Sequence, residues 1–391
     1  MRLVHLSDLH LGYRQYQRLT PTGINQREFD VATTFRRTID RIVDIAPDLI
    51  VVAGDVFHSS RPTNAAILHA FRQFLRLRHA LPDTKVVMIA GDHDTPRTTE
   101  SGSIMGLFES IGIDVAAGDP RRFRYDEHDV SVLAVPDGQM PALVPDAQSA
   151  HNVLVMHCDV DDVVPRYYAE LDRATVRISR GDLATARWSY VALGHYHSHH
   201  RVAENAFYSG SLDYTSLNVW FDLDEHPRKG FVVFDLDTGA ARFEAIEQSR
   251  DFIDLVPIDA RDLSVVEVNA AILRAVERVK GGIDDKVIRL VIRDIPRQVA
   301  RELDHRMIRE LKRRALSFHL DARRPEVTRR DASGAPARRP SVAEFVKQKL
   351  VERPIPPELD RERMVELGLK YLTDADAFTT TAAVATEAEA P

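Results

Sequence analysis

Five short motifs rich in aspartate, histidine and glycine follow five apolar runs of the sequence. They are Asp8-Leu9-His10, Gly54-Asp55, Gly91-Asp92-His93-Asp94, His157, and Gly194-His195-Tyr196-His197. Each run has the length and composition of a β-strand, and open α/β sheets bind their ligands beyond the carboxyl ends of their strands. We therefore expect the five motifs to converge at one edge of the fold.

Converging carboxylates repel one another, and their burial is unfavourable unless a positive charge lies between them. Divalent metal ions provide that charge, and mixed imidazole and carboxylate ligands favour manganese, iron or zinc over calcium. The motifs predict two sites that share Asp55, one made of Asp8, His10, Asp55 and His197, the other of Asp55, Asp92, His157 and His195. Two ions ~3.5–4 Å apart can supply a hydroxide at neutral pH, so the expected chemistry is the hydrolysis of a phosphate ester.

The elements that must position these motifs alternate between strands and helices. Five apolar runs predict strands: Arg2–Leu6, Asp48–Ala53, Lys85–Ala90, Asn152–Met156 and Tyr190–Leu193. The amphipathic segments Arg27–Ile45 and Asn64–His79 predict helices on the faces of a buried sheet. Four later runs predict antiparallel strands: Phe123–Val135, Phe207–Ser209, Gly230–Asp235 and Ala241–Ile246. Residues 1–250 are therefore expected to form one α/β domain.

Beyond residue 250 the composition changes in steps. Residues 251–330 alternate strands and helices, with a capping-box pattern at Ser264–Glu267, and predict a small α/β capping domain. Residues 331–340 have the composition of a linker, residues 341–373 predict two short helices, and residues 374–391 are expected to be disordered. Two short helices bury little apolar surface on each other, so they either dock on the body of the protein or bind a partner.

The overall composition is that of an ordinary globular protein. The chain has 391 residues, of which 44% are hydrophobic and 28% charged, and this length predicts two or three domains. The apolar runs are far shorter than the ~18 residues of a membrane helix, and Met1–His5 do not begin a signal peptide. We therefore expect a cytoplasmic protein that does not bind membranes. A single cysteine, Cys158, excludes an intrachain disulfide.

In this order, the five motifs resemble those of the calcineurin-like metallophosphoesterases. The fold implied is α/β, a metallophosphoesterase β-sandwich flanked by helices. Four longer motifs are similar to the branch of DNA double-strand-break repair nucleases, represented in bacteria by SbcD of the SbcC–SbcD complex: Ser7–Gly12, Gly54–Pro62, Tyr208–Leu212 and Lys229–Phe231. This resemblance implies a manganese-dependent exonuclease and endonuclease that acts on DNA ends. It also implies a small α/β capping domain, a homodimer, and C-terminal helices (341–373) that bind a coiled-coil SbcC-type ATPase.

The resemblance also assigns roles to individual residues. His93 corresponds to the catalytic histidine that contacts the phosphate and assists the leaving 3′ oxygen. His58 corresponds to an additional active-site histidine of the nuclease branch. Asp94 is expected to orient a neighbouring histidine, and Arg61 and the stretch Tyr13–Tyr16 are candidate DNA contacts.

Position 92 departs from the family pattern, which has asparagine where this chain has Asp92. The added negative charge is expected to strengthen metal binding and to weaken the attraction of an anionic phosphodiester. Two other functions stay open, the hydrolysis of a small-molecule phosphodiester and, because of Asp92, a non-catalytic role as a DNA-bridging subunit. The detached helices and the capping domain favour the nuclease over a small-molecule enzyme. Every predicted ligand position still holds a competent ligand, which argues against a loss of catalysis.

Overall fold

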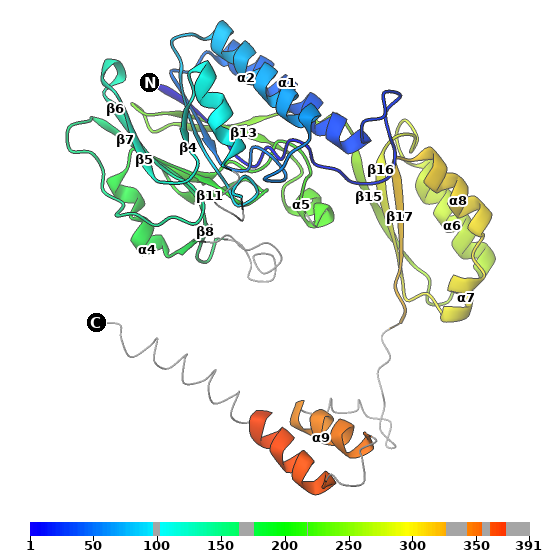
Figure 1. The fold of residues 1–391 in the computed structure, drawn as a ribbon. Helices are drawn as coiled ribbons and strands as arrows, with labels where there is room; N and C mark the ends of the chain where they lie inside the picture. Colours follow the sequence, from blue (N-terminus) through cyan, green and yellow to red (C-terminus); the bar gives the residue numbers. More distant parts are fainter. Residues whose placement is uncertain (97–101, 164–175, 217, 326–341, 354–359, 373–391) are drawn as a thin grey trace. The chain divides into compact units, whose positions relative to one another are not determined.

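The computed structural model describes residues 1–96, 102–163, 176–216, 218–325, 342–353 and 360–372 (Figure 1). Met1–Arg324 form one compact unit, and Pro325–Pro391 form a second. The first unit contains two six-stranded sheets. The first sheet has the order β14 (Ala241–Ala245), β13 (Gly230–Asp235), β1 (Arg2–Leu6), β2 (Leu49–Ala53), β3 (Lys85–Ile89), β4 (Asp114–Ala116). The second has the order β11 (His200–Ala203), β12 (Ala206–Tyr208), β10 (Tyr190–Gly194), β7 (His151–His157), β6 (Val130–Val135), β5 (Arg121–Tyr125).

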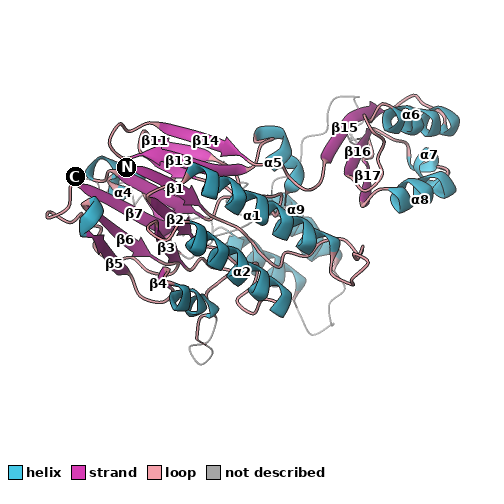
Figure 2. Cartoon of the chain, turned by 90° about the horizontal axis from the view of Figure 1, so that it is seen from above, coloured by secondary structure: helices cyan, strands magenta, loops and turns pink. Residues whose placement is uncertain are grey.

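The two sheets face each other across a shared apolar core. Val51 of β2 and Val155 of β7 belong to this core, and all five residues of β2 are buried. The outer face of the first sheet is covered by α1 (Gln26–Ile45), α2 (Asn64–Ala80) and the 3-10 helix η2 (Ile104–Ile111), with α1 and α2 lying across β1, β2 and β3 in Figure 2. The predicted β-sandwich flanked by helices is confirmed.

The strands that precede the five motifs are confirmed as β1, β2, β3, β7 and β10, and their ends differ from the prediction by at most one residue. The two predicted helices are α1 and α2. Helix α1 begins after Asn25, whose side chain accepts hydrogen bonds from the backbone of Arg27 and Glu28, and it ends at Ala46 in a left-handed conformation. Among the later strands, β12 is antiparallel to β11 but parallel to β10, because the chain returns through a short hairpin.

Residues 252–322 form a smaller sheet with its own apolar core. The parallel strands β15 (Phe252–Asp259), β16 (Val287–Arg293) and β17 (Ser317–Ala322) are covered on one face by α6 (Val265–Glu277), α7 (Arg297–Arg301) and α8 (His305–Arg314) (Figures 1 and 2). The capping box between Ser264 and Glu267 opens α6. The boundaries of a capping domain at 251–330 stay a prediction, and the linker and tail predicted at 331–340 and 374–391 lie outside the described residues.

The second unit contains α9 (Val342–Glu352) and a helix over residues 361–372. These helices contact each other where Leu350 packs against Gly368, a position at which any side chain would collide with the leucine. In the described ranges, no helix combines the length and the hydrophobicity that crossing a membrane requires. Short elements complete the fold: α4 (Arg180–Leu183), α5 (Val219–Glu225), β8 (Asp159–Val160), β9 (Arg177–Ile178), and the 3-10 turns η3 (Asp126–His128) and η4 (Thr185–Arg187).

Candidate metal centre

The seven predicted metal ligands lie at the carboxyl ends of strands in both sheets. They follow or end β1, β2, β3, β7 and β10 in this order: Asp8 and His10, Asp55, Asp92, His157, and His195 with His197. Strands β1, β2 and β3 are parallel neighbours, as are β7 and β10. Parallel neighbours end at the same edge of a sheet, so each sheet presents its ligands at one edge.

Four of the ligands have a left-handed backbone, with φ of 53° at Asp8, 45° at His10, 52° at Asp55 and 109° at His195. This conformation is uncommon outside glycine and concentrates at functional sites. Backbone hydrogen bonds hold it in place: Asp8 N donates to Gly54 O at 3.1 Å, and His10 N donates to Asp55 O at 2.9 Å. The loop after β1 is thereby fixed to the loop after β2.

Two glycines let the ligand loops approach one another closely. A side chain at Gly91 would collide with the carboxylate of Asp55, and one at Gly194 would collide with the carbonyl oxygen of Ala53. The Gly-Asp and Gly-His motifs of the sequence therefore have a physical reason, because the residue before each ligand must lack a β-carbon.

Asp8, His10 and His197 form one buried group, with ligand atoms within 4.8 Å of one another. The Nε2 atoms of His10 and His197 are 2.8 Å apart. Asp8 is held by its neighbours, since its Oδ1 accepts a 3.0 Å hydrogen bond from the backbone of His195 and its Oδ2 accepts one from the hydroxyl of Ser7. This group holds three of the four residues of one predicted ligand set.

Asp92, His157 and His195 form the other group. Asp92 Oδ1 lies 2.9 Å from His157 Nε2 and 3.6 Å from His195 Nδ1. Asp55 lies between the two groups, because its Oδ2 is 3.6 Å from His10 Nε2 and 3.7 Å from His157 Nε2. This is the position that a bridging carboxylate requires.

Burial controls protonation in the first group. It raises the pKa of Asp8, and it raises the pKa of Asp55 well above its usual value, because a buried carboxylate loses hydration. Burial also lowers the pKa of His10 well below its usual value and the pKa of His197 to about 3. Both imidazoles are therefore neutral at pH 7 and keep a lone pair for a metal, whereas the carboxylates need a nearby cation to stay ionised.

His157 differs from the other histidines. Burial opposes its protonation, but the carboxylates of Asp55 and Asp92 raise its pKa well above the usual value. Burial likewise opposes ionisation of Asp92, but hydrogen bonds from His157 and His195 lower the pKa of that carboxyl. His157 Nδ1 lies 2.9 Å from Ala53 O and donates to it, which directs Nε2 into the site. Buried nitrogen and oxygen donors of this kind fit divalent metal ions.

His93 and His58 line the open side of the site. His93 Nδ1 lies 2.9 Å from the carbonyl oxygen of His58, and the two rings stack with centroids 5.2 Å apart. The side chains of His93 and Asp92 are 28% and 22% exposed, whereas the other ligands are buried. Burial also lowers the pKa of His58 to about 4. A substrate can therefore reach the ligands from the side of His93.

Comparison with known proteins identifies the family. The family model described as calcineurin-like phosphoesterase matches residues 1–198, which is just over half of the chain and includes all five motifs. The chain belongs to this family. The predicted metallophosphoesterase resemblance is confirmed.

Several curated relatives of this phosphoesterase are described as DNA double-strand break repair protein Mre11. The protein of Methanococcus maripaludis is 27% identical over 253 residues, which are 60% of this chain and 63% of that protein. The protein of Methanocaldococcus jannaschii is 27% identical over 283 residues, 69% of each chain. The protein of Sulfolobus acidocaldarius is 29% identical over 208 residues, 51% of this chain and 50% of that one. The chain thus spans half to about two thirds of these relatives.

Asp94 and Tyr13 make contacts other than those expected from the sequence. Asp94 does not orient a histidine, because its carboxylate accepts hydrogen bonds from the backbone of Val56 at 3.0 Å, Phe57 at 2.8 Å and Gly91 at 3.1 Å. It therefore ties together the loops that carry Asp55 and Asp92. Burial raises the pKa of Asp94 to about 6, although these hydrogen bonds oppose the rise.

The candidate DNA contacts differ in their exposure to solvent. Tyr13 is only 6% exposed, and its ring packs edge-on against His58 at 5.0 Å, so this tyrosine supports the site instead of facing DNA. Arg61 is exposed and stays a candidate contact. Sequence reasoning also missed Asp222 and Thr215, which contact the loop of His197 from distant positions. Their spacing carries no local signal that could have identified them.

Proposed function

We propose that this phosphoesterase is the nuclease subunit of an SbcC–SbcD-type complex and hydrolyses phosphodiesters at DNA ends with two divalent metal ions, preferably manganese. One observation carries the proposal: two groups of ligands share Asp55, and His93 lines their open side. The names of the curated relatives, which are DNA double-strand break repair proteins, favour DNA over a small phosphodiester.

The geometry suggests a role for each group of side chains. When bound, two divalent ions supply a nucleophile at neutral pH and offset the charge that develops on the phosphoryl group. The neutral imidazoles of His10 and His197 hold one position, and Asp55 is common to both. His93 Nδ1 is occupied by the carbonyl oxygen of His58, and Nε2 lies 3.8 Å from Asp92 Oδ2, beyond hydrogen-bond distance, so it can hydrogen-bond a phosphate oxygen or the leaving 3′ oxygen.

The C-terminal helices support the proposed ATPase partner. Phe345 is 51% exposed and Tyr371 is 70% exposed, on helices of only 11 and 12 residues. Exposed aromatic side chains of this size are typical anchors of protein interfaces. We assign residues 341–373 to the coiled coil of an SbcC-type ATPase, and we expect a homodimer of the nuclease.

The decisive experiment is the cleavage of an end-labelled linear DNA duplex with manganese. Wild-type protein is compared with His93→Ala and with His79→Ala, a control that removes an exposed histidine near the end of α2. We expect loss of label from wild type and His79→Ala, and at least a hundredfold slower cleavage by His93→Ala. A chelator should abolish cleavage, and added manganese should restore it.

The other outcomes separate the alternative functions. Two bound metal ions without DNA cleavage, but with hydrolysis of bis-p-nitrophenyl phosphate, would favour a small-molecule phosphodiesterase. Absence of both metal binding and hydrolysis would favour a non-catalytic DNA-bridging subunit. Cleavage that appears only when the ATPase is added would keep the nuclease and make it dependent on its partner.

A further inference from the structure

His197 is a candidate metal ligand that lies on a loop beyond the end of its strand. It follows the end of β10 by three residues, and its ring meets Thr215 Oγ1 at 3.4 Å through Nδ1. A ligand on a loop needs external support to keep its ring in a fixed direction. Contacts from other parts of the chain must therefore hold the backbone at His197.

A buried ion pair spans the peptide that joins His197 to Ser198. Lys229 Nζ donates to the carbonyl oxygen of His197 at 2.7 Å and lies 2.9 Å from Asp222 Oδ2. The other oxygen of Asp222 accepts a hydrogen bond from the hydroxyl of Ser198 at 3.2 Å. Lys229 precedes β13 and Asp222 lies in α5, so side chains 24 and 32 residues farther along the chain hold consecutive residues of the ligand loop.

The ammonium group of Lys229 is surrounded by interaction partners. Besides these two partners it faces the ring of Tyr214, whose centroid is 5.2 Å away. Lys229 is 1% exposed and Asp222 is completely buried. Replacing a buried ion pair with apolar groups is often neutral or stabilising, so stability alone does not explain the pair. Its contacts indicate that it specifies one conformation of the His197 loop.

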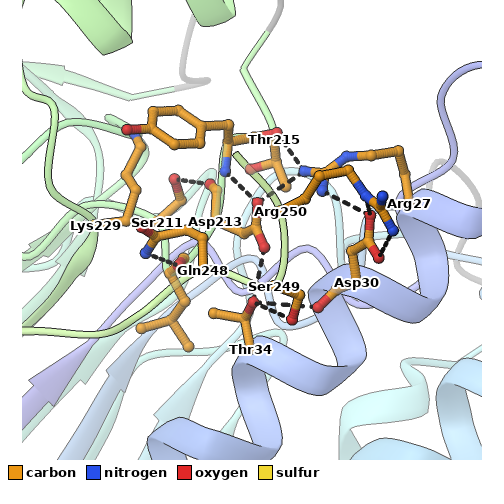
Figure 3. A network of polar contacts seen from close by, with 12 residues as sticks. Arg27, Asp30, Thr34, Ser211, Asp213, Thr215, Lys229, Gln248, Ser249 and Arg250 are labelled. Carbon is orange, nitrogen blue, oxygen red and sulfur yellow. Dashed lines mark hydrogen bonds and ion pairs between the residues drawn. The ribbon is translucent and has the colours of Figure 1, made fainter. Parts of the chain in front are cut away.

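The second hydrogen bond to the same carbonyl comes from the loop over residues 211–215. The backbone of Ser211 donates to His197 O at 3.0 Å, and the hydroxyl of Ser211 lies 3.1 Å from the same oxygen and 2.7 Å from Asp213 O. The carboxylate of Asp213 is held in turn by Arg27 and Thr34 of α1, each at 2.8 Å (Figure 3). The carbonyl of His197 thus has both lone pairs occupied by buried, anchored donors.

We propose that Lys229, paired with Asp222, is a positioning residue for His197 and aims its imidazole at the ion shared with Asp8 and His10. The proposal rests on the metal centre assigned under Proposed function. The second ligand group has other support, since His157 is fixed by Ala53 O and the backbone of His195, on the same loop as His197, donates to Asp8 Oδ1. Loss of Lys229 should therefore weaken one metal site and spare the other. Lys229 and Asp222 also lie beyond residues 1–198, which the family model matches.

The test is a manganese titration of the full chain by calorimetry, with the metal content after dialysis as a second readout. The variant Lys229→Met/Asp222→Asn removes both charges together and keeps an acceptor for Ser198. We expect wild type to bind two ions per chain. The double variant should bind one of them with unchanged affinity and the other about 10–100-fold more weakly.

The control is Leu290→Ala, which removes a buried side chain from β16 in the smaller sheet. It should lower the unfolding temperature and leave both manganese affinities unchanged. A folded double variant with two unchanged affinities would overturn the proposal. So would equal weakening of both sites in proportion to lost stability. Wild-type protein that binds no manganese would instead overturn the proposed function, and this inference with it.

Discussion

Asp92 decides how much positive charge the metal centre retains. Two divalent ions carry four positive charges, and the carboxylates of Asp8, Asp55 and Asp92 leave a net charge of +1, where an asparagine at position 92 would leave +2. The side chain of Asp92 is also 22% exposed, so its charge faces the incoming substrate. Its carboxylate should therefore tighten metal binding and repel a phosphodiester.

The variant Asp92→Asn tests this balance. We expect it to bind manganese roughly tenfold more weakly, because the charge of the ligands tunes divalent-ion affinity. With saturating manganese it should cleave DNA faster, since the remaining positive charge attracts the phosphodiester more strongly. Calorimetry and the initial rate of duplex cleavage measure the two effects. Unchanged metal content together with unchanged turnover would refute the idea, and Asp119→Asn, on a surface turn, controls for the loss of any one charge.

Residues whose positions depend on local spacing could be predicted, and residues whose contacts depend on distant partners could not. Asp55 was predictable because Gly54-Asp55 follows a continuous apolar strand. The burial of Tyr13 was not, because it depends on His58 and Arg27, which lie on other elements. Lys229 was recognisable as a motif residue, but its contact with His197 exists only in the folded chain.

Strand β1 carries an ionisable group in the core between the sheets. His5 is completely buried, and its Nδ1 lies 3.0 Å from the hydroxyl of Tyr190 in β10. Burial lowers the pKa of His5 to about 3. An unfolded chain therefore binds a proton at His5 below pH 6.5, whereas the folded chain binds it only near pH 3. The stability contributed by neutral His5 is complete above pH 6.5 and declines as the pH falls toward 3.

Replacing this histidine should reduce the acid sensitivity of the fold. The free energy of unfolding of His5→Phe should fall less steeply between pH 6 and pH 4, by about 1.4 kcal/mol per pH unit. Urea unfolding in the presence of chelator at several pH values measures the slopes. Tyr190→Phe is the matched control, because it removes the hydroxyl partner but keeps the titrating ring and hence the slope. Parallel curves for wild type and His5→Phe would contradict the prediction.

Helices and strands with a long periodic pattern of apolar residues could be predicted, but breaks within such a pattern could not. The helical segment after β16 is divided into α7 and α8, because the side chain of Asp304 accepts hydrogen bonds from Arg306 and Met307 and starts a new helix. Strand β17 was not predicted, because its alternation of apolar and polar residues is short. The residues of β16 with which it pairs lie 30 positions earlier in the sequence. Pairing of that kind is set by tertiary packing.

For the molecule as a whole, the clearest prediction concerns the second unit. The double variant Phe345→Asp/Tyr371→Asp should weaken binding of the SbcC-type ATPase at least thirtyfold, because aromatic anchors dominate interface energies. Basal cleavage of DNA by the nuclease alone should not change. Val256→Asp, which replaces a highly exposed apolar residue of β15, is the control. Binding is measured by co-elution and by calorimetry, and undiminished affinity of the double variant would remove these helices from the interface.

The pairing of β1 bears on how the protein is made. Arg2 at the start of β1 lies opposite Asp235 in β13. The first strand to leave the ribosome therefore pairs with a strand that is synthesised more than 200 residues later. Until β13 arrives, one edge of β1 has no backbone partner and is open to pairing with other chains. Lys229 arrives at the same time, immediately before β13. A ribosome that stalls before Gly230 would therefore leave a chain prone to aggregation rather than a working enzyme.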